Sequence, residues 1–285
     1  MRDVVQIVWF KRDLRTADHA PLAEAAARGP VLALYICEPG FWALPDSAGR
    51  QWRFVAESLA ELDGALRARG GGLVVRTGDA VEVLRELLDR LPVAAVWSHQ
   101  ETGNAWTYAR DRRVAALLGE RGVPWHERRQ HGVVRGLGNR DGWAARWERL
   151  MRAPTAPAPA ALNPPPVAGE APPSAAALGL GDDPPQRQPG GRAAGEALLS
   201  SFFGPRGRDY RRAMATPVDA FEACSRLSPH FAWGTLALRE VYQRARAELA
   251  AQDGPDGDRV QAQSIVSFRS RLHWHCHFMQ KLESQ

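Results

Sequence analysis

Four short apolar runs, separated by longer amphipathic stretches, place the strongest constraint on how the first half of the chain can fold. Val, Ile and Leu dominate these runs, with little of the alternation with polar residues that marks a strand facing water on one side. Strands buried on both faces have this composition, which is typical of a parallel sheet. We expect strands at Val4–Trp9, Val31–Ile36, Leu73–Arg76 and Val93–Ser98.

Helical patterns fill the intervals between these runs. In one of them Trp52, Val55 and Leu59 recur every three or four residues, and Asp79 stands where an N-cap would precede another helix. The expected helices are Pro21–Arg28, Gly49–Arg69, Ala80–Leu91 and Trp106–Glu120. Alternation of this kind predicts a Rossmann-like, doubly wound α/β domain with a parallel sheet over residues 1–135.

The middle of the chain has a different composition. Residues 153–192 contain 11 of the 21 prolines and few large apolar residues. This favours an extended, partly polyproline-like segment, so we expect residues 136–192 to link two domains.

The pattern beyond this segment is helical, with no run that resembles a strand. Expected helices are Gly195–Phe203, Phe231–Glu248 and Asp258–Leu282. We therefore expect an all-α domain over residues 193–285.

Net charge and cysteine content limit the kinds of partner and of metal or disulfide site that the chain can have. The net charge of +5 suits a polyanionic partner such as DNA, although the excess is modest. Three widely spaced cysteines, Cys37, Cys224 and Cys276, predict reduced thiols rather than a disulfide framework or an iron–sulfur cluster. The first ten residues resemble a strand rather than a signal peptide, and no apolar run is long enough to span a membrane. A cytoplasmic location with no membrane partner is the expectation.

Two polar segments follow expected strands, at the sheet edge where α/β proteins bind ligands. Lys11, Arg12, Asp13 and Arg15 follow the first strand, and could form either a ligand site or a solvated turn in which Asp13 pairs with an Arg. The segment His99–Asn104 follows the fourth strand, and could hold a small molecule or cap the next helix.

The glycine pattern argues against two common nucleotide sites. Gly70–Gly72 lies after a helix and before a strand, which predicts a helix stop rather than a phosphate-binding loop. The sequence also lacks a Gly-Lys-Ser/Thr motif. NAD-type and P-loop chemistry therefore lack support.

The helical half contains a candidate anion site. Ser225, Arg226 and Ser228 lie just before a helix that we expect to begin near Phe231. Hydroxyls, a guanidinium and free backbone N–H groups suit phosphate, but the same residues could form only an N-cap.

Three histidines near the end of the chain invite a zinc interpretation. On a helix His273 and His277 share a face, but His275 points nearly opposite, and no carboxylate lies between them in the His-Glu-x-x-His manner. We therefore expect no metal site; these residues line a polar groove or titrate on a surface.

Taken together, these motifs resemble the photolyase/cryptochrome family over nearly the whole chain apart from the linker. The opening segment Val8–Arg15, with Asp18, His19 and Leu22, is similar to the family's first signature. The segment Ser225–Pro229 resembles its flavin-contacting loop, and Ser267–Lys281 its next helix. Gly234 and Arg239 follow that loop as in the family. Positions that match the start of its helical domain are Gly191, Ala197, Leu198, Phe202, Tyr210 and Pro217.

The resemblance implies a cofactor, a reaction and a partner. FAD would be bound by Tyr210, Cys224, Ser225, Arg226, Leu227 and Ser228. Light-driven electron transfer from reduced FAD would split pyrimidine dimers in damaged DNA, whose bases are flipped out of the duplex. This is the activity of a deoxyribodipyrimidine photo-lyase, a carbon–carbon lyase. The family also implies a monomer and, in some members, an antenna chromophore in the α/β domain, whose identity stays open here.

Departures from the family pattern leave the function open between alternatives. The residues that would contact substrate are Phe268, Arg271, Trp274 and His275, and Arg271 stands where dimer-splitting enzymes have Glu. This substitution favours a cryptochrome-like blue-light photoreceptor without repair activity. The family's helical domain extends roughly twice as far as this chain, which predicts an incomplete FAD-binding domain and leaves an inactive fragment as a third alternative. Trp106 and Thr107 replace a folate-binding pair, so a folate antenna is not expected.

Overall fold

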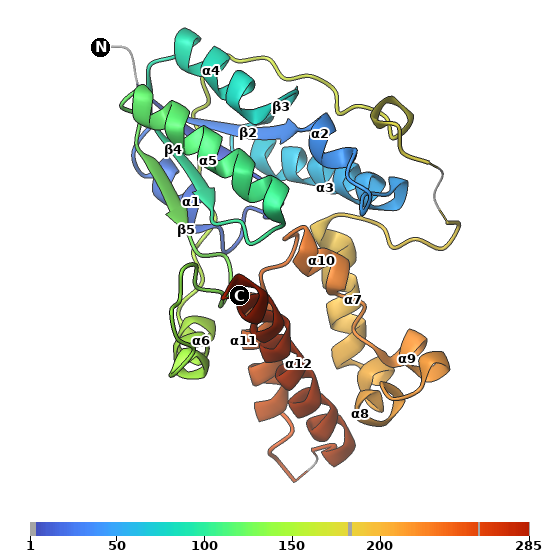
Figure 1. Ribbon diagram of the computed structural model, residues 1–285. Coiled ribbons are helices and arrows are strands. Elements are labelled where there is room, and N and C mark those ends of the chain that lie inside the picture. Colours follow the sequence, from blue (N-terminus) through green and yellow to red (C-terminus); the bar gives the residue numbers. More distant parts are fainter. Residues whose placement is uncertain (1–3, 182–183, 256, 285) are drawn as a thin grey trace. The chain divides into compact units, whose positions relative to one another are not determined.

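The computed structural model describes residues 4–181, 184–255 and 257–284. Its contacts divide the chain into two compact units, which are described separately (Figure 1). The α/β unit comprises Met1–Gln130, Ala156–Gly191 and Trp233–Thr235. The helical unit comprises His131–Thr155, Arg192–Ala232 and Leu236–Gln285.

The α/β unit is built on a five-stranded sheet with the order β3-β2-β1-β4-β5, in which every pairing is parallel. The strands are β1 (Val5–Phe10), β2 (Val31–Cys37), β3 (Leu73–Thr77), β4 (Val93–His99) and β5 (Trp125–Arg128). The first four confirm the expected strands to within one residue at each end. The fifth was not expected, because this short edge strand is only half-buried and carries three polar residues.

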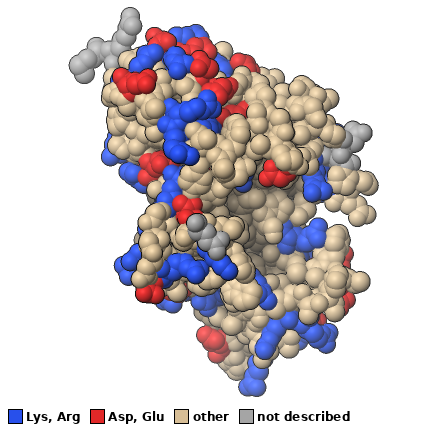
Figure 2. All heavy atoms as spheres, viewed as in Figure 1, with Lys and Arg blue, Asp and Glu red and all other residues tan. Residues whose placement is uncertain are grey.

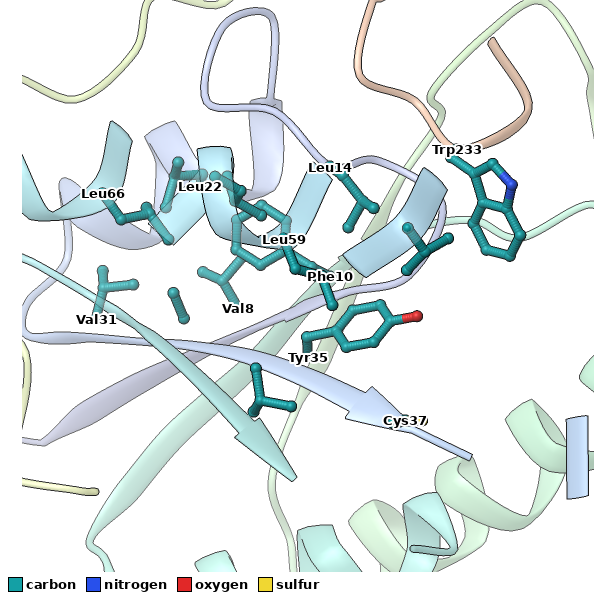
Figure 3. Close-up of a cluster of buried hydrophobic side chains, with 14 of the residues drawn as sticks. Val8, Phe10, Leu14, Leu22, Val31, Tyr35, Cys37, Leu59, Leu66 and Trp233 are labelled. Atoms are coloured by element: carbon teal, nitrogen blue, oxygen red, sulfur yellow. The ribbon is translucent and has the colours of Figure 1, made fainter. Parts of the chain in front are cut away.

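Side chains of the central strands alternate between two hydrophobic cores. Val8 and Phe10 face a core shared with α1 (Ala20–Ala26) and α3 (Gly49–Arg67), part of which is shown in Figure 3. Ile7 and Trp9 face a core shared with α4 (Ala80–Arg90) and α5 (Ala105–Glu120). Helices thus cover both faces of the sheet, which confirms the doubly wound α/β fold.

The expected helix boundaries follow local chemistry. The Asp79 carboxylate accepts a hydrogen bond from Val81 N at 2.9 Å and caps α4. Gly70, with a φ of +79°, follows the end of α3, and Gly71 N donates to Leu66 O. The glycine run is therefore a helix stop, as expected. One short helix, α2 (Pro39–Trp42), was not expected.

The segment expected as a linker, residues 136–192, is divided between the two units. Its first part contains α6 (Trp143–Arg152), in which Trp143, Trp147 and Met151 are buried at four-residue spacing in the core of the helical unit. Residues 156–191 pack on the α/β unit and include the short helix η1 (Ala176–Leu178). Glu170 N, for example, donates to Val75 O on the edge strand at 2.9 Å. A helix was not expected here, although Trp143 and Trp147 have the four-residue spacing of an amphipathic helix.

The helical unit contains no strand among its described residues. After α6 it comprises α7 (Arg192–Phe203), η2 (Pro205–Gly207), α8 (Tyr210–Ala213), α9 (Pro217–Ala223), α10 (Ser228–Ala232), α11 (Leu238–Ala250) and α12 (Arg259–Glu283). The single helix expected over Phe231–Glu248 is wrong, because a turn separates α10 from α11. Gly234 has a φ of +64° there, and a Cβ at this position would lie 2.2 Å from Arg12 O.

The two units differ in charge. The helical unit has 18 Lys and Arg against 12 Asp and Glu, whereas the α/β unit has 19 against 20. Groups of Lys and Arg side chains stand on the face of the helical unit in view (Figure 2). No helix in the described ranges is both long enough and apolar enough to cross a membrane.

Candidate functional site

The sheet order creates a crevice at the carboxyl ends of β1 and β4. Strand β1 pairs with β2 on one side and β4 on the other, so the connections lead away in opposite directions from this point. Ligands of open α/β sheets bind at such a switch point. The two polar segments expected at the ligand edge, after β1 and after β4, both begin here.

A small pocket lies at these strand ends. Its free volume is about 30 Å³, which is room for about one water molecule. Its walls combine aromatic rings with ionised groups: Trp9, Phe10, Tyr35, Phe41, Trp42 and Trp233, and Lys11, Arg12, Glu38, Glu101 and Arg110. All of these residues belong to the α/β unit.

Each cation of the pocket has a carboxylate partner. Lys11 Nζ lies 3.3 Å from Asp111, and Arg12 Nε lies 3.3 Å from Glu101. Arg110 donates to Glu38 at 2.7 Å and also pairs with Glu101 and Asp111. Three buried or half-buried cations and three carboxyl groups therefore form one network of paired groups, which fixes the positions of the groups at the pocket wall.

Burial and charge act differently on the two glutamates of this network. Burial raises the pKa of Glu38 to about 7, against the opposing effect of Arg110. Burial would also raise the pKa of Glu101, but the charges of Arg110, Lys11 and Arg12 outweigh it and lower that pKa. Glu101 is therefore ionised at neutral pH, whereas Glu38 is poised between its two protonation states.

The most informative pocket residues, Glu38 and Trp233, were not expected from the sequence. Glu38 is a single acid directly after the apolar run of β2, a position that marks the ligand edge once the strand is recognised. Trp233 comes from the turn between α10 and α11, and no local pattern connects it with the sheet.

Asp13 ties three segments together behind the pocket. Its carboxylate accepts hydrogen bonds from Lys11 N at 2.7 Å, His19 Nε2 at 3.0 Å and His99 Nδ1 at 2.7 Å. Burial alone would raise the pKa of Asp13, but the electrostatic interaction with, and the hydrogen bonds from, the two imidazoles hold it well below its ordinary value. Burial and the neighbouring His19 lower the pKa of His99 to about 3. Of the two alternatives for this segment, the solvated turn with an Asp13–Arg pair is wrong.

Asp13, His19 and His99 also form the one group of three close metal-type ligands among the described residues. Their hydrogen bonds disfavour a metal ion. His19 Nδ1 accepts from Leu22 N at 3.1 Å, so the proton of the neutral ring resides on Nε2. Nε2 is the atom that faces Asp13 and would have to bind the metal. The cluster is better described as a hydrogen-bonded hub that joins β1, α1 and β4.

In the helical unit, the expected flavin-binding loop lies between α9 and α10. Cys224, Ser225 and Arg226 are partly exposed, Ser228 is exposed and Leu227 is fully buried. Arg226 has a φ of +61°, and its guanidinium lies 4.2 Å from the centre of the Phe221 ring. Helix α10 begins at Ser228, not near Phe231, and has only five residues. Ser225 and Arg226 still lie directly before a helix, so the expected anion site stays a prediction, in which phosphate contacts would come mainly from side chains and the loop.

The loop is held in place by a second arginine. Arg206 donates to Leu198 O at 2.8 Å and to Glu222 O at 3.1 Å, and it also bonds Cys224 O. Burial lowers the pKa of Arg206, but the group stays a cation at neutral pH. Its donors serve backbone carbonyls, so Arg206 shapes the loop.

The four expected substrate residues on α12 do not share one surface. Arg271 and Trp274 are exposed together, with the guanidinium 4.4 Å from the indole centre. Phe268 is 3% exposed and packs against Phe202 in the core, so it offers no ring face to a ligand. His275 is turned inward, 5.7 Å from Phe231. The helical period separates the two pairs.

Neighbouring contacts join the loop to the exposed part of α12. Burial and the adjacent Cys224 raise the pKa of Tyr210, and the charge of Arg271 opposes this rise. Arg226 in turn lies near enough to Cys224 to oppose the rise that burial causes in the pKa of that thiol. We call Arg226, Cys224, Tyr210, Arg271 and Trp274 together the α12 surface; Arg271 and Trp274 are exposed, Cys224 and Arg226 are partly exposed, and Tyr210 is buried beneath them.

The α12 histidines pack on tryptophan. His273 lies 5.1 Å and His277 lies 5.8 Å from Trp143, measured between ring centres, and the two imidazole rings lie nearly parallel with their centres 6.3 Å apart. This confirms that His273 and His277 share a face.

Comparison with known proteins gives a consistent relationship. Residues 6–137 match the family model described as DNA photolyase. The deoxyribodipyrimidine photo-lyase of Halobacterium salinarum is 30% identical over 304 residues, which cover 98% of this chain and 61% of that protein. The cryptochrome DASH of Natronomonas pharaonis is 27% identical over 267 residues, covering 83% of this chain and 55% of that protein. The chain therefore spans 55–61% of the length of these curated relatives.

Solved structures agree on the fold. A bacterial class III photolyase from Agrobacterium tumefaciens has a TM-score of 0.79 at 23% identity, over 99% of this chain and 60% of that one. An archaeal photolyase from Sulfolobus tokodaii, described as holding two FAD molecules with a novel light-harvesting cofactor implied, has a TM-score of 0.68 at 22% identity, over 97% and 59%. These likenesses confirm an α/β domain combined with helices of a second domain.

Proposed function

Because this chain belongs to the photolyase/cryptochrome family, we propose that it serves a light-dependent DNA lyase of the deoxyribodipyrimidine photo-lyase type, with FAD in the helical unit. The α12 surface is the observation that carries this proposal. It joins the residues expected at the flavin, Tyr210, Cys224 and Arg226, to those expected at the substrate, Arg271 and Trp274.

The residues of this surface fit the polar part of FAD. Arg226 would pair with a phosphate, and the hydroxyls of Ser225 and Ser228 would donate to phosphate oxygens. Bound and reduced, the flavin supplies the electron that light transfers to a pyrimidine dimer. The protein's own contribution beside it is to hold damaged DNA: Trp274 presents a ring for stacking and Arg271 a cation for the backbone.

One observation favours a photoreceptor as the second candidate. Arg271 is exposed beside Trp274, at the position where a carboxylate is expected in a dimer-splitting enzyme. A cation cannot accept a hydrogen bond from a dimer base. A cryptochrome-like protein would use the same flavin for signalling and would have no need of that acceptor.

We also propose that the pocket of the α/β unit is the site of a second, antenna chromophore. Its walls are rich in aromatic side chains, among them Phe41, Trp42 and Trp233, and a planar ring would require some of these side chains to move apart, because the free volume is about 30 Å³.

Titration of the full chain with FAD tests the main proposal. We expect a bound-flavin absorbance spectrum, and an affinity about tenfold weaker in Arg226→Ala, because a charge-assisted hydrogen bond is lost. Arg244→Ala removes the same charge from an exposed i,i+4 pair on α11, and should match the unmodified chain. No flavin binding at millimolar FAD would overturn the proposal.

Blue light then separates the two candidates in the flavin-loaded chain. Loss of cyclobutane dimers from irradiated oligonucleotides supports the lyase. Reduction of the flavin by light without loss of dimers supports the photoreceptor.

A further inference from the structure

A second, larger pocket lies at the β3 edge of the sheet, within the α/β unit. It is enclosed by α3, by the edge strand β3 and by residues 168–173, a segment that follows β3 and that we call the strap (Figure 1). Its free volume is about 340 Å³, within the range of about 300–1,000 Å³ that is usual for small-molecule sites. It shares no lining residue with the pocket at the ends of β1 and β4.

The strap is attached at two points, one on each side of this pocket. Glu170 N donates to Val75 O at 2.9 Å and so holds the strap to β3. Further along, Pro173 O accepts from Trp52 Nε1 on α3 at 2.9 Å. The two residues between these attachments line the pocket. The cavity is therefore the space over which the strap crosses from β3 to α3.

Most of the wall is apolar. Residues three or four apart on a helix, and two apart on a strand, share a face. The wall takes such residues from α3 and β3: Ala56, Leu59, Ala60, Leu73 and Val75. Two of the three helix residues are alanines, so the helix leaves room beneath the strap. These walls suit a hydrocarbon or aromatic group of moderate size.

One more turn along α3, the wall becomes charged. Arg67 Nε lies 2.7 Å from Asp63 Oδ2, and Asp63 Oδ1 accepts from Leu73 N at 2.8 Å. Both oxygens of Asp63 thus have a partner, and its carboxylate orients the guanidinium. Among the residues that the structure describes, the Arg67 side chain has no other hydrogen-bond partner. Its Nη1 and Nη2 groups are therefore available as donors at the pocket.

The carboxylates of the pocket are less available than this guanidinium. Glu170 Oε2 accepts from Thr77 N at 3.0 Å, and Glu170 Oε1 lies 4.0 Å from Arg76 Nε. Asp63 is occupied on both oxygens, as described above. A cationic ligand would have to compete with these partners, whereas an anionic ligand meets N–H groups of Arg67 that point to no other acceptor. The arrangement of donors and acceptors favours an anion.

We propose that this pocket binds a small organic carboxylate. Its hydrocarbon or aromatic body would lie between α3, β3 and the strap, and its two carboxylate oxygens would accept from Nη1 and Nη2 of Arg67, whose fork matches them in geometry. Such a ligand contacts the strap on one side and the sheet on the other, so its binding ties the two together. The proposal is independent of the flavin site, because every residue of this pocket belongs to the α/β unit.

Three ligands that share one apolar body test the choice of charge. 4-Phenylbutyrate is an anion, 4-phenylbutyramide is neutral and 4-phenylbutylamine is a cation. We expect the full chain to bind 4-phenylbutyrate with a Kd on the order of 0.1 mM. The amide should bind about three- to fivefold more weakly, a small factor because Arg67 is 68% exposed and water screens the pair, and the amine more weakly still. Isothermal titration calorimetry measures all three constants.

Removal of the donors gives the sharper result. Arg67→Met keeps an apolar stem but leaves the Asp63 carboxylate beside the site without its cation. We expect the preference for the carboxylate over the amide to disappear or reverse. Arg90→Met is the matched control, because Arg90 is 65% exposed and forms the same kind of i,i+4 pair on α4. This control should keep the preference.

A change of volume locates the site. Ala56→Leu fills part of the pocket and should weaken the carboxylate and the amide at least about tenfold. Ala65→Leu adds the same group on the opposite side of α3, outside the pocket, and should leave both affinities unchanged. Circular dichroism checks that each variant is folded.

Each contrary result overturns a defined part of the proposal. Binding of none of the three ligands at millimolar concentration overturns the pocket as a binding site. Equal affinity of the unmodified chain for the carboxylate and the amide, or tighter binding of the amine, overturns the choice of an anion. An unchanged preference in Arg67→Met overturns the role of Arg67, and unchanged affinities in Ala56→Leu overturn the location. None of these results bears on flavin binding, which Arg226→Ala tests separately.

Discussion

In the α/β unit the charged side chains at the strand ends are buried, whereas those of the helical unit's candidate site stand on its surface. Lys11, Asp13, Glu38 and Glu101 are each less than 8% exposed and are held by fixed partners. On α12, by contrast, Arg271 is exposed, and Trp274 and Phe278 are 47% and 54% exposed. The first arrangement fixes the walls of one small site, and the second offers cations and rings to a large ligand.

The difference also appears in net charge. The positive excess of the whole chain resides in the helical unit, while the α/β unit has nearly equal numbers of both signs. A buried network of paired groups suits a small ligand, and a basic exposed surface suits DNA. Changes to the first should therefore alter stability or small-molecule binding, and changes to the second should alter DNA binding with little effect on folding.

Removal of the Asp13 carboxylate should have the largest effect. Asp13→Ala leaves Lys11 N, His19 Nε2 and His99 Nδ1 without their acceptor inside the protein. We expect the free energy of unfolding to fall by about 3–5 kcal/mol, as measured by urea denaturation. Glu248→Ala, which breaks an exposed pair on α11, should change it by less than about 0.5 kcal/mol. If Asp13→Ala and Glu248→Ala lowered the free energy of unfolding equally, the buried charges of the α/β unit would be no more important for stability than the exposed charges of the helical unit.

The same hub should make stability depend on pH. The pKa of His99 is about 3 in the folded chain, below its ordinary value, so the unfolded state binds the proton more readily. Its contribution is complete above about pH 6.5 and is lost as pH falls toward 3. The lowered pKa of Asp13 acts in the same direction, with its loss at still lower pH.

We therefore expect the chain to lose about 2 kcal/mol of unfolding free energy between pH 6.5 and pH 5 through His99. His99→Asn keeps an N–H donor toward Asp13 but cannot titrate. Parallel urea curves at both pH values measure the difference between the two proteins. The same pH dependence in both would contradict a neutral, buried His99.

The sequence predicted the α/β unit better than the helical unit, for a physical reason. Strands buried on both faces have apolar runs that can be recognised locally, so β1 to β4 and their helices were expected nearly to the residue. The break between α10 and α11, by contrast, depends on Gly234, which is part of the α/β unit and whose close approach to Arg12 O joins positions more than 200 residues apart. The spacing of apolar residues along the sequence cannot reveal a contact between such distant positions.

The candidate sites show the same limit. The loop after β1 was expected at the ligand edge, but the partners of Asp13 were not, because His19 and His99 meet it only in the folded sheet. On α12 the resemblance named four residues for one surface, while the helical period turns Phe268 into the core and leaves Trp274 outside. Resemblance to a family can indicate which residue occupies a functional position. Whether its side chain is exposed depends on how this chain packs.

The smallest expected effect concerns the exposed ring on α12. The Trp274 side chain is 47% exposed and its ring contacts the exposed Arg271 and Phe278, so Trp274→Ala removes a stacking surface without opening the core. We expect affinity for an ultraviolet-irradiated oligonucleotide to fall about tenfold, the lower range for the loss of one stacked base, with an unchanged free energy of unfolding. Val266→Ala, at a residue of similar exposure on the same helix, is the matched control. Fluorescence anisotropy measures the affinity for the oligonucleotide. If both variants bind it as tightly as the unmodified chain does, DNA does not bind at the α12 surface. The two units would then differ in net charge but not in the kind of ligand that their exposed or buried side chains bind.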